Sequence, residues 1–221
     1  MNFRIILISI LINYLSYTTL KAADSQGFRG GSKGAVLLGT GAHLGLGSDT
    51  GAEFIYVHSK ELQFNLFYWS ASSDIDLSDP PVEAKASING SLIGLNGRYF
   101  PGNSFFIEGG FGYRNIGFDY ELNESTTNTK VSGDLTANAV TINAAIGNQW
   151  VLGPGIVLNF NWIGANFPIS SSSKTNSKIE GALAENLSQA LSDSDAEFED
   201  LSVATSKSSS PIISASIGWM F

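Results

Sequence analysis

Apolar and polar residues alternate along most of the chain beyond residue 33. In one stretch, Leu62, Phe64 and Leu66 alternate with Gln63 and Asn65. A period of two places all apolar side chains on one face and so predicts β-strands. We identify eight such segments, at about 34–47, 52–59, 61–70, 86–100, 104–120, 135–150, 155–167 and 211–221.

The connections between these segments are alternately short and long. Short turns are predicted at 59–60, 101–103 and 152–154, and long polar loops at 73–85, 121–134 and 168–210. Outer-membrane barrels have short periplasmic turns and longer external loops, and an even number of strands places all the long loops on one side. The pattern therefore predicts an all-β protein, a closed antiparallel up-and-down transmembrane β-barrel of about eight strands.

The two faces of the segments differ in a way that indicates which side meets lipid. One face of the first segment carries Val36, Leu38 and Leu44, whereas the other is mostly glycine. The sixth segment sets Ile142 and Ile146 against small or amide side chains. A soluble sheet would carry charge opposite its core, whereas small side chains suit a narrow lumen. The bulky side chains are therefore expected to face outward.

The N-terminal residues have the features of a secretory signal. Arg4 precedes an apolar stretch at 5–12 that is too short to span a bilayer as a helix, and Ala22 is a small residue suited to cleavage. We predict a signal peptide at 1–22, a periplasmic lead-in at 23–33 and an outer-membrane barrel at 34–221, with its long external loop at 168–210. The expected location is the cell outer membrane of a Gram-negative bacterium.

Composition supports this prediction and excludes other classes. Charged residues make up only 14% of the chain, aromatic residues reach 11%, and there are 24 glycines and no cysteine. A formal net charge of −8 argues against nucleic-acid binding, because phosphates require cationic side chains. No sequence motif indicates a cofactor or a metal site, and we expect none.

The last segment ends at Phe221, with Trp219, Ile217 and Ile213 alternating behind it. It resembles the assembly signal that the barrel-insertion machinery reads. The chain from about residue 33 onward resembles the small eight-stranded outer-membrane barrels of the OmpA/OmpX/OmpW-like family. The resemblance implies insertion into the outer membrane, contact with its lipid and lipopolysaccharide, no cofactor, and a structural, adhesive or narrow-pore role. We expect a monomer.

Aromatic residues recur near the predicted periplasmic ends of the strands, where a membrane girdle is expected. The proposed girdle residues are Tyr99, Phe105, Trp150, Trp162, Trp219 and Phe221.

Four polar residues are predicted to point into the lumen. Arg98 and Glu108 lie opposite or diagonal to each other across the 101–103 turn, and Arg114 shares their face. A charge in a narrow lumen needs a partner, so these residues predict a structural ion pair or a constriction for small solutes. His43 is the fourth; it is a conceivable general base, but no nucleophile motif accompanies it.

The last long loop is predicted to contain a short helix. Ser177 and Glu180 fit a capping box, and Ile179, Leu183 and Leu187 then recur at intervals of four. An acidic stretch follows. The segment at 176–200 could cap the barrel, bind a partner or divalent cations, or simply be solvated, and its role stays open.

The favoured function is a non-enzymatic integral outer-membrane barrel with a structural or surface-interaction role and at most a narrow pore. One alternative is a secreted, lipocalin-like barrel that binds an apolar ligand; its bulky residues would face inward. A second alternative is a lipid A-modifying barrel enzyme that uses His43.

Overall fold

The computed structural model describes residues 24–44, 46–76, 82–126, 128–152, 155–180, 204 and 207–221. The predicted signal peptide at 1–22, and the part of the predicted loop helix beyond residue 180, lie outside these residues.

The described chain forms a closed antiparallel barrel. Its strands are β1 (Gly34–Ala42), β2 (Asp49–Val57), β3 (Leu62–Asp76), β4 (Val82–Tyr99), β5 (Phe105–Glu124), β6 (Thr129–Leu152), β7 (Ile156–Glu180), β8 (Ser210–Pro211) and β9 (Ile213–Met220). Each strand from β1 to β7 pairs with the next, and β9 pairs with both β7 and β1. The two-residue β8 also pairs with β7 and is separated from β9 only by Ile212. We therefore count β8 and β9 as one strand of the barrel, which has eight strands in the described residues. The predicted up-and-down topology is confirmed.

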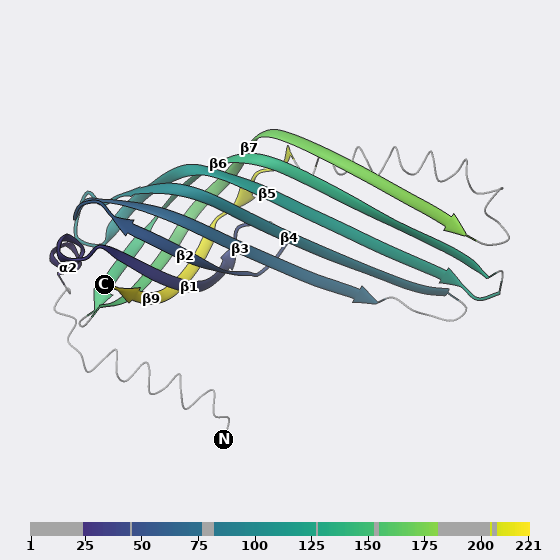
Figure 1. The fold of residues 1–221 in the computed structure, drawn as a ribbon, viewed down its shortest axis with the longest axis horizontal. Coiled ribbons are helices and arrows are strands. Elements are labelled where there is room, and N and C mark those ends of the chain that lie inside the picture. Colours follow the sequence, from purple (N-terminus) through teal and green to yellow (C-terminus); the bar gives the residue numbers. More distant parts are fainter. Residues whose placement is uncertain are drawn as a thin grey trace, which may run out of the picture.

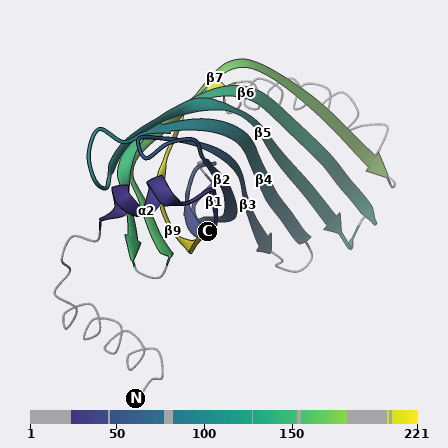
Figure 2. The same ribbon diagram turned by 60° about the vertical axis from the view of Figure 1, so that its left-hand side comes forward.

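Five strands continue far beyond the barrel. The last β2–β3 pair is Thr50 with Ser70, yet β3 runs on to Asp76 and its partners run on with it. Figures 1 and 2 show β3 to β7 curving away as a sheet past the ends of β1, β2 and β9. We call this sheet the extension; it comprises residues 71–76, 82–90, 116–124, 129–137 and 173–180.

The extension corrects the predicted long loops. Most of the residues at 73–85 and 121–134, and those at 168–180, are paired β-strand. Ser177–Glu180, predicted to open a helix, is the end of β7. These segments appeared loop-like because their outward face is polar, but antiparallel pairing needs only backbone groups and carries on regardless.

The predicted lead-in contains a short helix, α2 (Ser25–Gly31). The Asp24 carboxylate caps it by accepting a hydrogen bond from the Gly27 amide over 2.8 Å. The signal for this helix is Asp24 itself, which the glycines at 27, 30 and 31 obscured.

In the described part of the chain, no helix is sufficiently long and apolar to cross a membrane.

The side chains sort as the alternation predicted. Leu38 and Trp219 point outward and are 64% and 48% exposed, whereas Arg98 and Glu53 point inward and are 0% and 2% exposed. A soluble barrel would carry charge on its exterior, whereas this exterior is apolar, so the lipocalin-like alternative does not fit. One detail of the first strand was wrong. β1 ends at Ala42, and Leu44 turns into the lumen instead of continuing outward.

Two bulges interrupt the alternation of β7. The register with β6 shifts between Ile146 and Gly147 and again between Val140 and Thr141. At the first shift Trp162 and Ile163 both point outward, which adjacent residues of a regular strand cannot do. The bulges change which residues of β7 face the lumen, and the period-two pattern alone gave no sign of them.

Candidate functional site

The end of the lumen on the α2 side is filled with apolar side chains. The buried cluster there consists of Ala35, Leu37, Ile55, Val57, Val151, Val157 and Met220. Phe100 and Phe106 pack edge to face nearby, with ring centroids 5.6 Å apart. Such packing leaves little room for water between these side chains.

Helix α2 closes the same end from outside the strands (Figure 2). Its Arg29 is fully buried, donates to the carbonyl of Asn103 over 2.6 Å and to that of Lys60 over 3.0 Å, and stacks on the Phe100 ring at 3.7 Å. Burial lowers the pKa of Arg29 to about 10, which leaves the guanidinium charged at neutral pH. Ser25 accepts a hydrogen bond from the Val151 amide at 3.0 Å, so the helix is joined to β6 as well.

A charged network occupies the middle of the lumen. Arg98 lies directly opposite Glu108 in the β4–β5 register and donates through Nε to Glu108 Oε2 over 2.7 Å. Its Nη2 reaches Glu53 Oε2 on β2 at 3.2 Å. Both carboxylates are also hydrogen-bonded by neighbours: Asn65 and Ser216 donate to Glu53, and Asn96 donates to Glu108. The network therefore ties β2, β3, β4, β5 and β9 together across the lumen.

Glu53 was not predicted as a site residue. Four successive apolar residues at 54–57 hid the phase of β2 in the sequence. The structure sets that phase, with Ile55 and Val57 inside and Phe54 outside, and so turns Glu53 into the lumen. A lone carboxylate directly before an apolar run was the available signal.

The outer end of the lumen is closed by a second apolar layer that includes His43. Leu44, Phe67, Trp69 and Leu92 form a buried cluster, with the His43 ring stacked on Trp69 at 4.0 Å. His43 Nδ1 and Asp49 Oδ1 are 2.9 Å apart, and both side chains are buried.

His43 is therefore separate from the Arg98 network. Asp49 Oδ2 accepts hydrogen bonds from the His43 and Leu44 amides, so the Asp49 carboxylate shapes the turn that follows β1. The nearby Ser210 hydroxyl donates to the backbone carbonyl of His43 at 2.7 Å rather than to its ring. The contacts of His43 and Asp49 are therefore those of two residues that stabilise a turn.

Arg114, the other predicted lumen cation, lies further along β5 than Glu108. It is buried on β5, donating to Ser210 Oγ at 3.2 Å and to the Ser208 carbonyl at 2.9 Å. It thus holds the start of the last strand against the barrel mouth.

The space left between the outer layer and the network is very small. A cavity of about 10 Å³ lies among His43, Glu53, Trp69 and Glu108, which is roughly the room of one water molecule. Two apolar layers and an ion-paired layer therefore occupy the lumen in succession.

The outward face carries a continuous apolar band. Along β3 it runs through Phe64 and Leu66 to Tyr68, and the next outward residue is Ser70. Tyr68 shares a cross-strand row with Ile93 and Tyr113, and the following row is wholly polar. That polar row consists of Ser70, Ser91, Asn115, Asn138 and Ser172.

Five of the predicted girdle residues are exposed, outward-facing and close to strand ends at the α2 side: Tyr99, Phe105, Trp150, Trp219 and Phe221. Trp162 is also exposed but lies inside β7, six residues after Ile156. Tyr68 and Tyr113 occupy the opposite edge of the apolar band and were not predicted as girdle residues.

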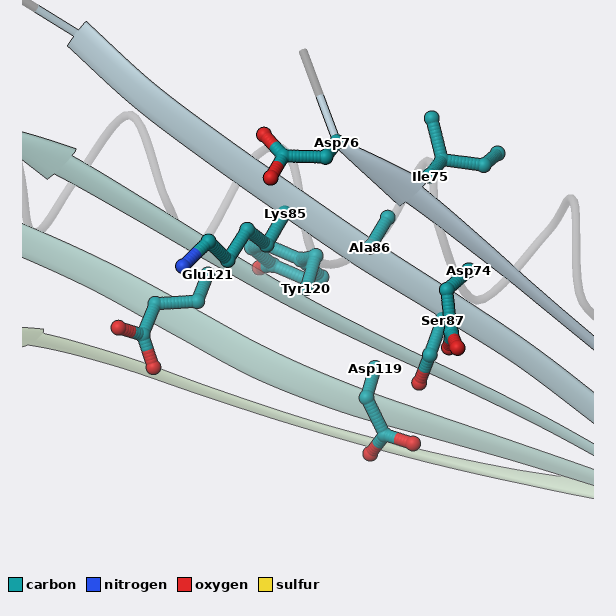
Figure 3. Close-up of a pocket in the computed structure, with 9 residues that line it drawn as sticks. All are labelled: Asp74, Ile75, Asp76, Lys85, Ala86, Ser87, Asp119, Tyr120 and Glu121. Carbon is teal, nitrogen blue, oxygen red and sulfur yellow. The ribbon is translucent and has the colours of Figure 1, made fainter. Parts of the chain in front are cut away.

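The extension carries charge on its outward face and apolar side chains on its inner one. An open hollow of about 400 Å³ near its end is lined by residues of β3, β4 and β5. Figure 3 shows Asp74, Ser87 and Asp119 close together, as their register requires. Hydrogen bonds from Lys130 and from Asn123 hold the pKa of Glu121 below its usual range. The carboxylates here belong to a mixed-charge, solvated surface.

Within the described residues, no group of three His, Cys, Asp or Glu side chains is arranged to hold a metal ion.

Comparison with known proteins gives likenesses of shape only. No protein-family model matches the chain, and no curated protein matches it. The structure of Acinetobacter baumannii CarO superposes with a TM-score of 0.49 at 10% identity, covering 86% of this chain and 98% of that one. The structure of A. baumannii CarO2 superposes with a TM-score of 0.48 at 11% identity, covering 86% of this chain and 99% of that one. A major outer membrane protein from Thermus thermophilus superposes with a TM-score of 0.48 at 12% identity, covering 85% of this chain and 99% of that one. At this level of similarity, no role of those proteins carries over to this chain.

Proposed function

We propose that this chain is a non-enzymatic outer-membrane barrel that is closed to solutes and displays the extension at the cell surface. The observation that carries the proposal is the inverted sorting of side chains. Large apolar residues such as Leu38, Phe111 and Trp219 are exposed on the outside, while Glu53 and Arg98 are buried within. Hydrocarbon, rather than water, is the solvent that suits such an exterior.

The closed backbone supports the same placement. In a bilayer every backbone amide and carbonyl needs a partner within the protein. β1 and β9 pair through Ala42 and Ile213 at one end and Ala35 and Met220 at the other, so the ring has no open edge there. The extension begins where the apolar band ends. Its edge strands, β3 and β7, therefore lie in water.

The sealed lumen favours a structural or surface-interaction role over conduction. An eight-stranded barrel has an interior only just wide enough for side chains. Here the Arg98 network and the two apolar layers occupy it, and α2 covers one end. We infer that solute flux is negligible and that the extension is the functional surface.

Assembly follows from the last strand. The Phe221 side chain is exposed, while its backbone exchanges hydrogen bonds with Gly34 at 2.8 and 3.0 Å. We propose that the barrel-insertion machinery reads this strand after export directed by residues 1–22. The mature protein is then a monomer surrounded by outer-membrane lipid and lipopolysaccharide.

Cell fractionation with heat-modifiable gel mobility tests the membrane placement, and planar-bilayer recording tests the seal. We expect recovery with the outer membrane, a shift in mobility on boiling and no resolvable conductance. Recovery as a soluble periplasmic protein would overturn the membrane placement. Steady ion conductance by the purified barrel would overturn the closed lumen.

A further inference from the structure

A second hollow lies on the outward face, where the barrel passes into the extension. Its volume is about 540 Å³, within the range of small-molecule sites. It forms because β2 ends at Asp49, so that β3 beyond Ser70 has no β2 partner. The side chains that border this step are short, and the sheet is therefore hollowed here. We call it the rim hollow; the lining residues that matter below are Thr50, Tyr68, Ser70, Asn89, Ser91 and Asn115.

The rim hollow is polar but carries no charge. Its lining residues are hydroxyl, amide, alanine and glycine residues together with Tyr68. Among the described residues, the hydroxyls of Thr50, Ser70 and Ser91 form no hydrogen bond with one another or with other groups. Asn115 uses its Nδ2 on Asn138 at 2.7 Å, which leaves its Oδ1 as an acceptor. The hollow thus offers both donors and acceptors to a ligand.

These groups fit one ligand chemistry better than the others. A phosphate would require a cation, and none lines the hollow. An apolar ligand would leave the hydroxyls of Ser70 and Ser91 without partners. A neutral sugar has hydroxyls that both donate and accept, and its C–H faces pack on an aromatic ring such as that of Tyr68.

The position of the hollow agrees with this chemistry. Tyr68 and Ile93 form the last apolar row of the outward band on β3 and β4, and Ser70 and Ser91 follow directly. If the band lies in hydrocarbon, as the proposed function requires, the hollow faces the sugar-bearing layer of the outer leaflet. We propose that the rim hollow binds a neutral saccharide, either free or as the sugar part of an outer-leaflet glycolipid.

The test uses the full mature barrel in detergent and a matched pair of variants. Ser91→Trp fills the hollow, whereas Ser172→Trp places the same group on an exposed serine in the same cross-strand row on β7. Tyr68→Ala and Tyr113→Ala form a second pair, since both tyrosines share the preceding row and only Tyr68 lines the hollow. Heat-modifiable mobility verifies that each variant has folded.

Three probes separate the possible sources: a free neutral oligosaccharide of hexoses, a glycolipid that carries the same oligosaccharide in the same detergent, and phosphatidylethanolamine, a lipid that bears no sugar. We expect sugar-bearing probes to bind the wild type and Ser172→Trp alike, and to bind Ser91→Trp and Tyr68→Ala about tenfold more weakly or worse. Binding of the free oligosaccharide identifies a free saccharide as sufficient. Binding only of the intact glycolipid identifies the membrane source.

Three results would overturn the proposal: no sugar-bearing probe binds the wild type, both members of a variant pair lose binding equally, or the sugar-free lipid shows the same sensitivity to Ser91→Trp. The proposed function fails separately. A protein recovered as soluble that still binds free oligosaccharide through Ser91 and Tyr68 retains the saccharide site but not the membrane placement.

Discussion

Arg98 and Glu108 face each other across β4 and β5, with Arg98 Nε 2.7 Å from Glu108 Oε2. The same guanidinium reaches Glu53 on β2, so one cation serves two buried carboxylates. The Arg98–Glu53 contact joins β4 to β2, which are not neighbours in the barrel, and the three side chains lie together in the lumen.

Removal of the central cation should strongly destabilise the barrel. Arg98→Met leaves Glu53 and Glu108 buried without their cation, and we expect the free energy of unfolding to fall by about 3–5 kcal/mol. Urea unfolding in detergent measures the change. Lys60→Ala is the control, because the Lys60–Glu61 pair is solvent-exposed at 3.5 Å and should contribute far less. Equal losses in the two variants would show that the network is not structural.

Close approach of β9 to β1 should make one glycine irreplaceable. A methyl group at Gly218 would overlap the Val36 carbonyl oxygen and the Leu37 backbone, neither of which can move without breaking the pairing of β1 and β9. Gly218→Ala should therefore reduce the yield of folded, heat-modifiable protein severely. Gly97→Ala should fold like the wild type, because the nearest atom to its added carbon is 3.9 Å away. Normal folding of Gly218→Ala would mean that the two strands are less tightly paired.

A charged side chain on the outward face should lower the free energy of unfolding only where it lies within the apolar band. Leu95 lies in an outward row with Leu66 and Phe111, and Leu95→Arg should lower the free energy of unfolding in lipid vesicles by about 2–4 kcal/mol. Ser172→Arg, beyond the band, should have little effect. If the two substitutions cost the same in vesicles, the band does not meet hydrocarbon.

The end of the extension should loosen in acid. Hydrogen bonds from Lys130 and Asn123 depress the pKa of Glu121 below its ordinary value of 4.5, so folding favours its ionised form. A depressed carboxylate pKa contributes stability above that ordinary value, and the contribution is lost as the pH falls through the lowered pKa. Amide exchange at Lys130, corrected for its intrinsic pH dependence, should be steady from neutral pH to about pH 5 and then accelerate at lower pH. Glu121→Gln should abolish this acceleration; if it persists, another group is responsible.

The barrel itself could be predicted from the sequence because lipid imposes a strict pattern. Each strand that faces hydrocarbon must alternate, as Leu62, Phe64 and Leu66 do with Gln63 and Asn65, and the confirmed topology follows from counting such segments. The extension could not be predicted in this way. Beyond Ser70 the outward face is polar, so residues such as Asp74 and Asp76 made paired strands resemble loops.

Other features depend on three-dimensional packing that no local pattern records. The roles of Glu53 and Asp49 could not be predicted, because they depend on which face of β2 points inward and on where β2 begins. The bulge at Trp162 shifts the alternation of β7, and the period-two pattern gave no sign of it. Helix α2 contains three glycines and is held by the contacts of Arg29 with the turns beside it.

Tryptophan fluorescence in bilayers of brominated lipid tests the orientation of the side chains most directly. The chain has four tryptophans, of which Trp150, Trp162 and Trp219 are exposed on the outside and Trp69 is buried in the lumen. We expect strong quenching of a Trp69→Phe variant, whose remaining tryptophans contact acyl chains. A variant that keeps only Trp69 should show almost the same fluorescence in brominated lipid as in ordinary lipid. Quenching of Trp69 with protection of the other three would show that the greasy faces point inward, and would contradict the account.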